Sequence, residues 1–465
     1  MKRIRSISDT IAAIATPPGI GAIAVIRVSG PNAIEIVNKC FRPSGRMSLI
    51  DFPSNTIRHG YITMQAKGIT IDEVMVALYR KPRSYTGEDM VEIDTHGGYV
   101  VPKTVLECIL DAGARLAEKG EFTQRAFLNG KMDALQAEAV MDVISAKTEL
   151  SLRQGMSQLS GRLSREIESI RERLLDCATE VEVGLDYPDE YFGDIGDKVM
   201  EELNAVKERL ERLLFTAVEG ISLRNGINTV ILGKPNVGKS SLMNRILGTD
   251  RSIVTEIPGT TRDFITETID MRGIPLNVVD TAGIRETVGE IEREGVNRAL
   301  NVAESADMIL FVLDASEPIQ DMDLEILDKI KDKRYIIVIN KIDVNSNLDV
   351  HLIRQHLGTD RHIVTISALK GEGMEKLEDF IYDEVTSKEI NVGFTPMITN
   401  IRQKQLISEM LNSVKDALNI LKANSSIDLV AADLREAIES SDEMLGRVYT
   451  EDLLDRMFSN FCVGK

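Results

Sequence analysis

The spacing of hydrophobic residues changes along the chain and divides it into four regions. Between Asp9 and about Ala117, short β-rich runs such as IAVIRVSG and IDEVMVALYR alternate with Gly and Pro turns, which is typical of an α+β domain. From Phe122 to Phe215 the period becomes helical. The pattern therefore predicts a mixed domain followed by a helical one.

Two helix faces lie in this helical region, separated by the stretch YPDEYFGDIGD, whose Pro, Gly and Asp residues predict a loop. A third face follows Asn400. The residues of the three faces are Leu163, Ile167, Ile170 and Leu174; Val199, Leu203, Val206, Leu210 and Leu213; and Leu406, Met410, Leu411 and Val414.

Between the helical regions, strand-like and helical segments alternate from the break RNG (residues 224–226) to about Val385, which predicts a parallel α/β domain. Because the ends of such a domain often lie close together, we interpret it as an insertion into one helical domain. The expected fold is multidomain α/β and α. The expected boundaries are 1–120, 121–225, 226–387 and 388–465.

Composition narrows the classes of function. The 465 residues carry a net charge of −18, which is unfavourable for general binding of nucleic acid. An RNA substrate would need a local basic patch or a basic partner. Apolar runs such as MILFVL are too short to span a bilayer, and no apolar segment follows the basic start MKRIRSISD. We expect a cytoplasmic chain with no membrane segment.

The cysteines fit neither a disulfide framework nor a zinc site, because their spacing is wide and irregular. They are Cys40, Cys108, Cys177 and Cys462. Cys462 is fourth from the end of FCVGK, the position of a lipidated cysteine, but Gly464 and Lys465 fit that signal poorly. Phe458 and Phe461 are expected to pack and so seat this segment.

The most specific chemical motif lies at the start of the α/β region. Residues 233–240 (GKPNVGKS) complete the GxxxxGK[ST] pattern between a predicted strand and a predicted helix. Its glycines allow backbone N–H groups to approach phosphate oxygens. Lys239 reaches the β- and γ-phosphates, and Ser240 provides a ligand for Mg²⁺.

Further elements follow in the order of a GTPase. Asp280 and Gly283 of DTAG follow a strand and fit roles in holding Mg²⁺ and sensing the γ-phosphate. Residues 340–343 (NKID) provide a carboxylate for guanine N1 and N2, and residues 367–370 (SALK) offer N–H groups to guanine O6. The combination predicts a Ras-like GTPase domain.

One position departs from the Ras pattern. The residue after DTAG is Ile284, whose apolar side chain cannot orient the attacking water as glutamine does. Thr261 is the natural second Mg²⁺ ligand, and Arg262 beside it is not established as an arginine finger. Either hydrolysis is slow or another group orients the water. The candidate acids are Glu286, Glu290, Glu292 and Glu294, although an acidic face at a helix start explains most of them equally well.

The ordered set of motifs resembles the MnmE (TrmE) family of tRNA-modification GTPases over nearly the whole chain. The segments that carry the resemblance are ATPPGIGAIAVIRVSG, SYTGEDMVEIDTHGG, GEFTQRAFLNGKMDALQAEAV, the GTPase motifs with IPGTTRD, and the terminal CVGK. The resemblance implies a folate-binding and dimerising N-terminal domain, and a GTPase domain inserted in a helical one.

The resemblance also implies cations and catalytic groups. A potassium ion would replace the arginine finger, held by Asn236 and by the carbonyls of Thr255, Ile257 and Thr260. Glu292 would position the water. We assign catalysis to Glu292, Lys239 and Cys462. The complete GTP-binding set is Asn236, Val237, Gly238, Lys239, Ser240, Ser241, Thr255, Glu256, Ile257, Pro258, Gly259, Thr260, Thr261, Asp280, Thr281, Ala282, Gly283, Asn340, Lys341, Asp343, Ser367, Ala368 and Leu369.

The family's folate site carries over onto Arg27, Glu92, Lys131 and Lys465. Carboxylates recognise the paired donors of a pterin, and Arg or Lys recognise its glutamate tail. The expected ligand is 5-formyltetrahydrofolate or a relative, and whether the Cys462 thiol reacts or only shapes the pocket is left open.

The family further implies a homodimer that joins an MnmG-type flavoprotein, which alone carries FAD, in a heterotetramer or larger complex acting on wobble uridine of tRNA. Two alternatives are a ribosome-assembly switch GTPase, which needs no folate domain, and a folate-dependent transferase acting alone, for which a GTPase apparatus is superfluous.

Overall fold

The computed structural model describes residues 9–64, 68–186, 188–248, 252–253, 266–279, 300–344, 347–357, 363–385, 395–423, 427–459 and 461–465. The chain forms two compact units, Met1–Met141 with Asp442–Lys465, and Asp142–Ser441. The C-terminal segment therefore folds with the N-terminal unit. The four expected domain boundaries stay a prediction.

The N-terminal unit contains a seven-stranded sheet of order β3-β4-β5-β6-β2-β1-β7. Its neighbouring strands are antiparallel except for the pair β1 and β7. The strands are β1 (Ile11–Ile14), β2 (Ile23–Ser29), β3 (Phe41–Pro43), β4 (Thr56–Met64), β5 (Ile69–Tyr79), β6 (Met90–His96) and β7 (Arg115–Leu116).

Side chains alternate between the two faces of this sheet. On β6, Val91 and Ile93 point into the core beneath α1 (Ala33–Cys40) and α2 (Val100–Asp111), whereas Glu92 lies on the opposite face. The period of two therefore places one set of hydrophobic residues under the helices, whereas the opposite face carries Glu92 together with the buried Ile11 and Ala13.

The C-terminal segment packs on the N-terminal unit. Helix α16 (Glu451–Phe458) contacts α3 (Glu121–Leu128), and Phe458 and Phe461 are buried with ring centroids 5.2 Å apart. Burial of each ring stabilises the packing of the C-terminal segment by about 1.5–3 kcal/mol. The predicted seating by these two phenylalanines is confirmed.

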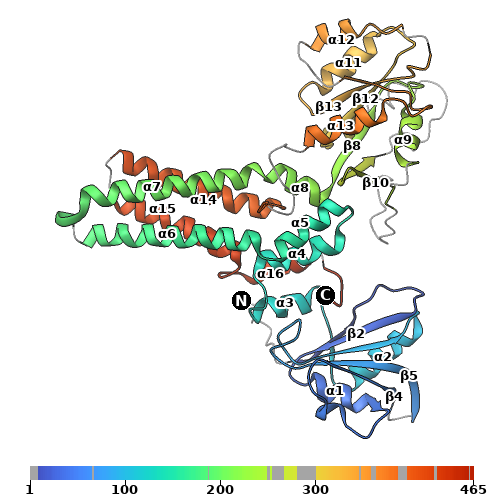
Figure 1. Ribbon diagram of the computed structural model, residues 1–465, viewed down its shortest axis with the longest axis vertical. Helices are drawn as coiled ribbons and strands as arrows, with labels where there is room; N and C mark the ends of the chain where they lie inside the picture. Colours follow the sequence, from blue (N-terminus) through green and yellow to red (C-terminus); the bar gives the residue numbers. More distant parts are fainter. Residues whose placement is uncertain are drawn as a thin grey trace. The chain divides into compact units, whose positions relative to one another are not determined.

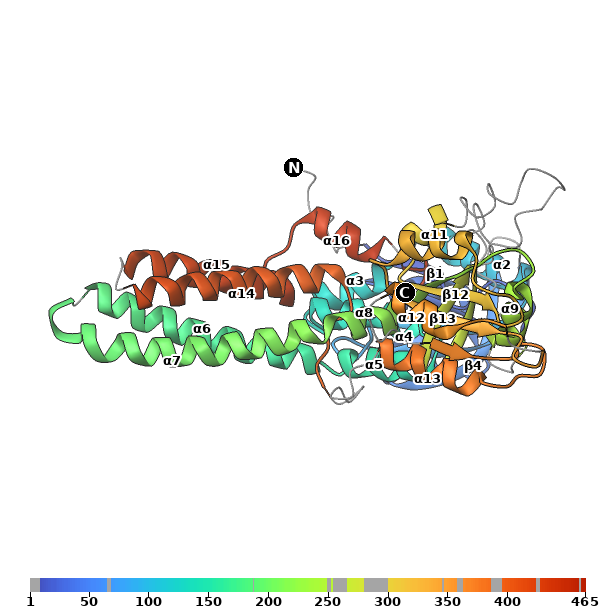
Figure 2. The ribbon, with the colours of Figure 1, turned by 90° about the horizontal axis from the view of Figure 1, so that it is seen from above.

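The second unit contains a group of helices. Both ribbon views show α6, α7, α14 and α15 running side by side (Figures 1 and 2). The predicted faces are confirmed, because every residue named on them is buried. The helices, of which α4 and α15 cross the boundaries between the units, are α4 (Ala134–Ser145), α5 (Glu149–Leu159), α6 (Arg162–Asp186), α7 (Pro188–Phe215), α8 (Ala217–Asn225), α14 (Ile401–Lys422) and α15 (Ile427–Leu445).

The loop predicted for YPDEYFGDIGD is wrong from Pro188 onward, where α7 begins. Proline is well tolerated in the first helical turn, because its missing N–H has no partner there, and the acids that follow suit a helix N-terminus. The intrinsic loop preference of this composition is overridden.

The same unit contains the predicted α/β domain, with a sheet of order β14-β13-β12-β8-β11-β10-β9. The strands are parallel except where β10 pairs with β11 and β9. They are β8 (Ile227–Leu232), β9 (Ser252–Ile253), β10 (Thr266–Met271), β11 (Ile274–Val279), β12 (Met308–Asp314), β13 (Tyr335–Asn340) and β14 (Ile363–Thr365).

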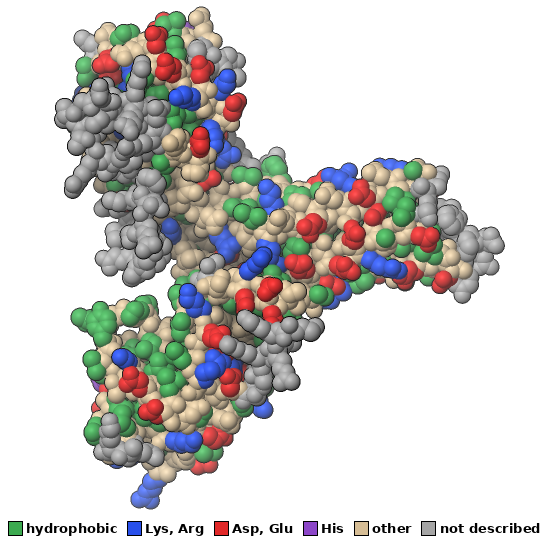
Figure 3. Space-filling view, turned by 180° about the vertical axis from the view of Figure 1, so that it is seen from behind, with side chains coloured by type: hydrophobic (Ala, Val, Ile, Leu, Met, Phe, Trp, Pro, Cys, Tyr) green, Lys and Arg blue, Asp and Glu red, His purple; other side chains and the backbone are tan. Residues whose placement is uncertain are grey.

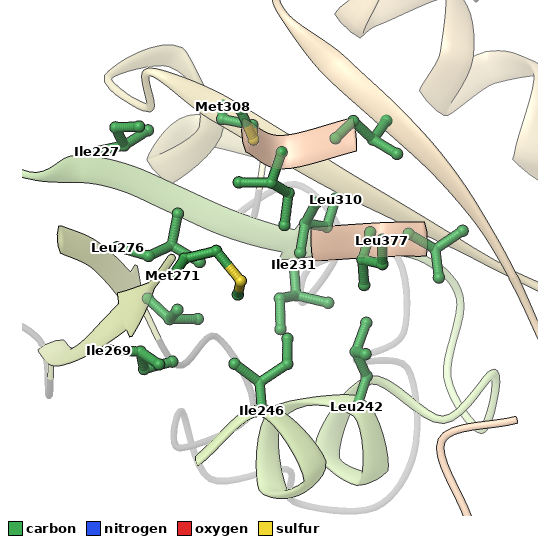
Figure 4. Close-up of a cluster of buried hydrophobic side chains, with 14 of the residues drawn as sticks. Ile227, Ile231, Leu242, Ile246, Ile269, Met271, Leu276, Met308, Leu310 and Leu377 are labelled. Atoms are coloured by element: carbon green, nitrogen blue, oxygen red, sulfur yellow. The ribbon is translucent and has the colours of Figure 1, made fainter. Parts of the chain in front are cut away.

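Hydrophobic clusters cover both faces of this sheet, as a parallel sheet requires. Figure 4 shows the first cluster, in which Leu242 and Ile246 of α9 face strand residues such as Ile231. The flanking helices are α9 (Lys239–Leu247), α11 (Asp321–Ile330), α12 (Val350–Leu357) and α13 (Met374–Val385). Among the helices of the described residues, none is both long and apolar enough to cross a membrane.

Candidate active site

The phosphate-binding loop lies between β8 and α9, and its backbone needs glycine at two positions. Gly233 and Gly238 have φ values of 148° and 96°. A Cβ at Gly233 would lie 2.4 Å from the Val312 carbonyl oxygen, and one at Gly238 would lie 2.2 Å from Nδ2 of Asn340. Any side chain there would displace the loop, so the glycines of the motif are required by space as well as by conformation.

Lys239 begins α9 and turns its ammonium back over the loop. Its Nζ donates to the carbonyl oxygens of Gly233, at 2.9 Å, and Lys234, at 2.6 Å. Ser240, the next residue, is exposed. The helix N-terminus, the loop and a lysine together form the kind of site that binds phosphate anions.

Two loops, residues 340–343 and 367–370, are predicted to bind the base. Hydrogen bonds of Asn340, the last residue of β13, connect them to the phosphate loop. Its Nδ2 donates to the carbonyl oxygen of Val237 at 3.0 Å, and its Oδ1 accepts from the backbone N–H of Ala368 at 3.0 Å. From α9, Nε of Arg245 donates to the carbonyl oxygen of Ala368 at 2.8 Å. Three segments distant in sequence are thus held in one arrangement.

Asp343 is the carboxylate predicted to read guanine. Ser367 donates from Oγ to its Oδ1 at 2.7 Å. This hydrogen bond lowers the pKa of Asp343, so the group is ionised at neutral pH. Leu369 is 76% exposed beside these polar groups. The described part of the site therefore offers an acceptor for a base and an apolar surface next to it.

Several predicted residues lie outside the described residues. They comprise the first-switch set Thr255, Glu256, Ile257, Pro258, Gly259, Thr260, Thr261 and Arg262, the DTAG set Asp280, Thr281, Ala282 and Gly283 with Ile284, and the acids Glu286, Glu290, Glu292 and Glu294. Their assignments remain predictions.

A second polar site lies on the N-terminal sheet. Arg27 on β2 stands directly opposite Glu92 on β6, and its Nε and Nη2 donate to Oε1 at 2.9 and 2.8 Å. The guanidinium lies over the rings of Tyr85 and Phe122, 5.3 and 5.6 Å from their centroids. Burial and Glu92 raise the pKa of Tyr79 nearby. The two predicted residues Arg27 and Glu92 are thus brought together.

The C-terminal segment reaches the same place. Arg27 Nη1 donates to the carbonyl oxygen of Gly464 at 3.3 Å, and the carbonyl oxygen of Lys465 accepts from the N–H of Phe122 at 3.1 Å. Cys462 is exposed and reduced. Lys131 donates to the carbonyl oxygen of Pro82 at 3.2 Å, and among the described residues no hydrogen bond or ion pair joins it to Arg27 or Glu92.

Sequence reasoning missed some of the groups that hold these sites. Asp314, the last residue of β12, contacts Lys341, and Asp323 in α11 contacts Lys234. An acid at the end of the apolar run MILFVL was the available signal for Asp314. Tyr85 and Phe122 lay within quoted motifs, but only the fold shows that they flank Arg27.

Comparisons with known proteins agree with this architecture. The family model "MnmE helical domain" matches residues 135–462, and "GTP-binding protein TrmE N-terminus" matches residues 10–131. The chain is 51% identical over 458 residues to a tRNA modification GTPase MnmE of Thermotoga petrophila, covering 98% of this chain and 100% of that protein. A Clostridioides difficile protein of the same name is 44% identical, with 99% and 100% covered.

Among solved structures, the chain is similar to Era from Aquifex aeolicus, with 30% identity over 40% of this chain and 66% of that one and a TM-score of 0.28. The relatives match along their full lengths, and they confirm the resemblance drawn from the motifs. The chain belongs to the MnmE family of tRNA modification GTPases, enzymes that bind and hydrolyse GTP.

Proposed function

We propose that this protein is a potassium-activated GTPase that acts with an MnmG-type flavoprotein and a tetrahydrofolate one-carbon donor. The product is an aminomethyl-type group at C5 of the wobble uridine, position 34, of certain tRNAs. The observation that carries the proposal is that one chain has both a guanine-nucleotide site and a second polar site completed by its own C-terminal segment.

Magnesium and potassium fit the residues at the phosphate loop. Ser240 and Thr261 would hold Mg²⁺, and Ser240 is an exposed hydroxyl at the start of α9. Asn236 would hold K⁺ together with the carbonyls of Thr255, Ile257 and Thr260. Asn236 is exposed on the phosphate loop, between Gly233 and Lys239, and its backbone has a φ of 63°. When bound, the cations neutralise charge that develops on the phosphates.

The chain's own groups would do the rest of the hydrolysis. Lys239 moves its hydrogen bonds from the two loop carbonyls to the phosphates, and Glu292 orients the attacking water. Because Ile284 has no polar group, we assign this role to an acid of the segment that follows it. Asp343 and the N–H groups after Ser367 select guanine.

The N-terminal site fits a folate in its chemistry. Glu92 accepts hydrogen bonds and Arg27 donates them, and the rings of Tyr85 and Phe122 lie near the guanidinium. Such a set suits a ligand with a planar polar ring and a carboxylate tail. Lys131, Lys465 and Cys462 would complete the pocket, with Lys131 and Lys465 on the tail.

Dimerisation is supported by an apolar patch on the N-terminal unit. Two adjacent loops, joined by the hydrogen bond from Gly97 N–H to the carbonyl oxygen of Ala22, carry Ile20 and Tyr99 at 93% and 66% exposure. Figure 3 shows hydrophobic side chains gathered on this unit. An exposed patch of this kind is typical of a protein interface. A second copy and the flavoprotein are the proposed partners.

The pathway is tested by nucleoside analysis of tRNA from cells that lack this protein. We expect the C5 modification of the wobble uridine to disappear and to return when the gene is restored. The flavoprotein must still be present in both strains, as a control. An unchanged modification would contradict the proposal and favour a switch GTPase of ribosome assembly.

The potassium role is tested by GTP turnover in matched potassium and sodium chloride. We expect turnover to be at least about tenfold faster in potassium, which corresponds to about 1.4 kcal/mol of barrier. Asn236→Ala should lose this difference, whereas Asn301→Ala, an exposed asparagine of the same domain, should keep it. Equal turnover of the native protein in both salts would exclude potassium activation.

A further inference from the structure

Two lysines on the nucleotide-binding loops face acids from one short segment. The segment runs from the end of β12 to the first turn of α11, and we name its three acids Asp314, Glu317 and Asp323 the acidic bracket. Lys341 belongs to the base-binding loop and Lys234 to the phosphate loop. One connection thus touches both halves of the GTP site.

The first arm of the bracket is Asp314 with Lys341. Oδ2 of Asp314 accepts from Nζ of Lys341 at 2.6 Å, and Oδ1 accepts from the N–H and Oγ of Ser316 at 2.9 and 2.6 Å. The Asp314 side chain is only 6% exposed, whereas that of Lys341 is 35% exposed. Burial acts to raise the pKa of Asp314, but these hydrogen bonds outweigh it and the pKa is lowered.

This arm controls a strained part of the base-binding loop. Lys341 has a φ of 66°, which is rare for a residue with a side chain. It lies between Asn340, which ties the loop to Val237 and Ala368, and Asp343, which reads the base. Holding the lysine side chain therefore helps to hold the backbone that aims the Asp343 carboxylate.

The second arm is Asp323 with Lys234. Nζ of Lys234 lies 2.9 Å from Oδ2 of Asp323 and 3.9 Å from Oε2 of Glu317. The side chains of Lys234 and Asp323 are 11% and 3% exposed. Oδ1 of Asp323 is buried and has no hydrogen-bond partner within the described part of the chain. The carboxylate therefore depends on Lys234, because an unpaired buried charge is costly.

The second arm also holds the backbone of Lys234, whose carbonyl group binds Lys239. The carbonyl oxygen of Lys234 accepts from Nζ of Lys239 at 2.6 Å. A displacement of Lys234 would therefore move the resting position of the Lys239 ammonium relative to the phosphates. Oδ2 of Asp323 also accepts from the N–H of Gln320, which ties this arm to the start of α11.

We propose that the acidic bracket positions the two halves of the GTP site. Asp314 sets the selectivity for guanine, and Asp323 sets the affinity for the phosphates. Both are positioning residues, because each acts through a lysine. The inference rests on the GTP binding of the family and uses neither potassium nor folate. Its failure would leave the proposed function intact.

The two arms predict different changes in nucleotide selectivity. Inosine diphosphate lacks the N2 amino group that guanine offers to Asp343, so the ratio of GDP to IDP affinity reports how well this carboxylate is aimed. If the acids only stabilised the fold, their substitution would lower the melting temperature and leave the ratio of GDP to IDP affinity unchanged. The ratio therefore separates positioning from mere structural support.

The experiment measures GDP and IDP affinities of the full chain by displacement of a fluorescent GDP. For Asp314→Asn we expect the ratio to fall by about tenfold, because loss of one well-aimed hydrogen bond is worth roughly that factor. For Asp323→Asn we expect both affinities to fall by about tenfold with the ratio unchanged. Asp321→Asn, an exposed acid in the first turn of α11, is the matched control and should change neither value.

Asp314→Glu provides a second variant that keeps the charge. Its longer side chain displaces the pairing atom, so we expect a ratio between those of the native protein and Asp314→Asn. Melting curves identify which variants are folded. A native ratio in either folded Asp314 variant overturns the first arm, and native affinities in folded Asp323→Asn overturn the second.

Discussion

The two polar sites of this protein are built in different ways. The phosphate loop is made mostly of backbone from eight consecutive residues, with glycine where no Cβ fits. The N-terminal site is made of side chains and of carbonyl groups of the C-terminal segment, and its Arg27 and Gly464 lie 437 residues apart. A site built from local backbone can be recognised from a motif. A site built from distant side chains exists only once the chain has folded.

The largest effect should come from the backbone-built site. In Gly238→Ala the new Cβ would meet Asn340 at a φ of 96°. Strain of about 1–3 kcal/mol and the loss of the Asn340 bridge should weaken GDP binding by roughly 100-fold. Titration with fluorescent GDP checks this, and unchanged folding of the N-terminal unit is the control. Native affinity would mean that the loop adapts to a side chain.

A smaller effect is expected at the N-terminal site. In Gly464→Ala, at a φ of 98°, the Cβ would lie 2.4 Å from the carbonyl oxygen of Ile14. Displacement of this carbonyl from Arg27 should weaken binding of 5-formyltetrahydrofolate by about tenfold and spare GTP hydrolysis.

Calorimetry measures this binding, with Gly45→Ala as the matched control because a Cβ there meets nothing within 4 Å. If Gly464→Ala binds folate like the native protein, the C-terminal segment does not contribute to that site. If the native protein binds no folate, the proposed donor is wrong.

The smallest effect concerns a contact of the N-terminal sheet outside its site. His96 Nδ1 lies 2.7 Å from Oδ1 of Asp72, and this hydrogen bond raises the pKa of His96 above 6.5, with a further contribution from Glu73. The stabilisation is therefore complete below pH 6.5 and is lost as the pH rises through the folded-state pKa.

Melting temperature should accordingly fall slightly between pH 6 and pH 9 through this pair, and Asp72→Asn should remove that part of the pH dependence. GTP affinity should not change at either pH. A pH profile that Asp72→Asn leaves as steep as before would show that other groups are responsible.

The sequence predicted the fold class, the helix faces and the phosphate loop, because these follow from periodicity and local spacing. It could not predict that Arg27 and Glu92 pair, since the register of β2 against β6 depends on the whole sheet. The same limit applies to Asp314 and Lys341, which come from neighbouring strand ends. The start of α7 at Pro188 was missed because proline and acids, which are common in loops, also suit the first turn of a helix.

The seating of the C-terminal segment has a consequence for the order of events during synthesis. Domains generally fold from the N-terminus while the rest of the chain is still being made. The sheet that bears Arg27 therefore emerges from the ribosome hundreds of residues before Gly464. Until the C-terminal segment has been synthesised, the surface on which Phe458 and Phe461 pack stays exposed. A chain that ends before Gly464 lacks the carbonyl group that Arg27 contacts, so its N-terminal site is incomplete.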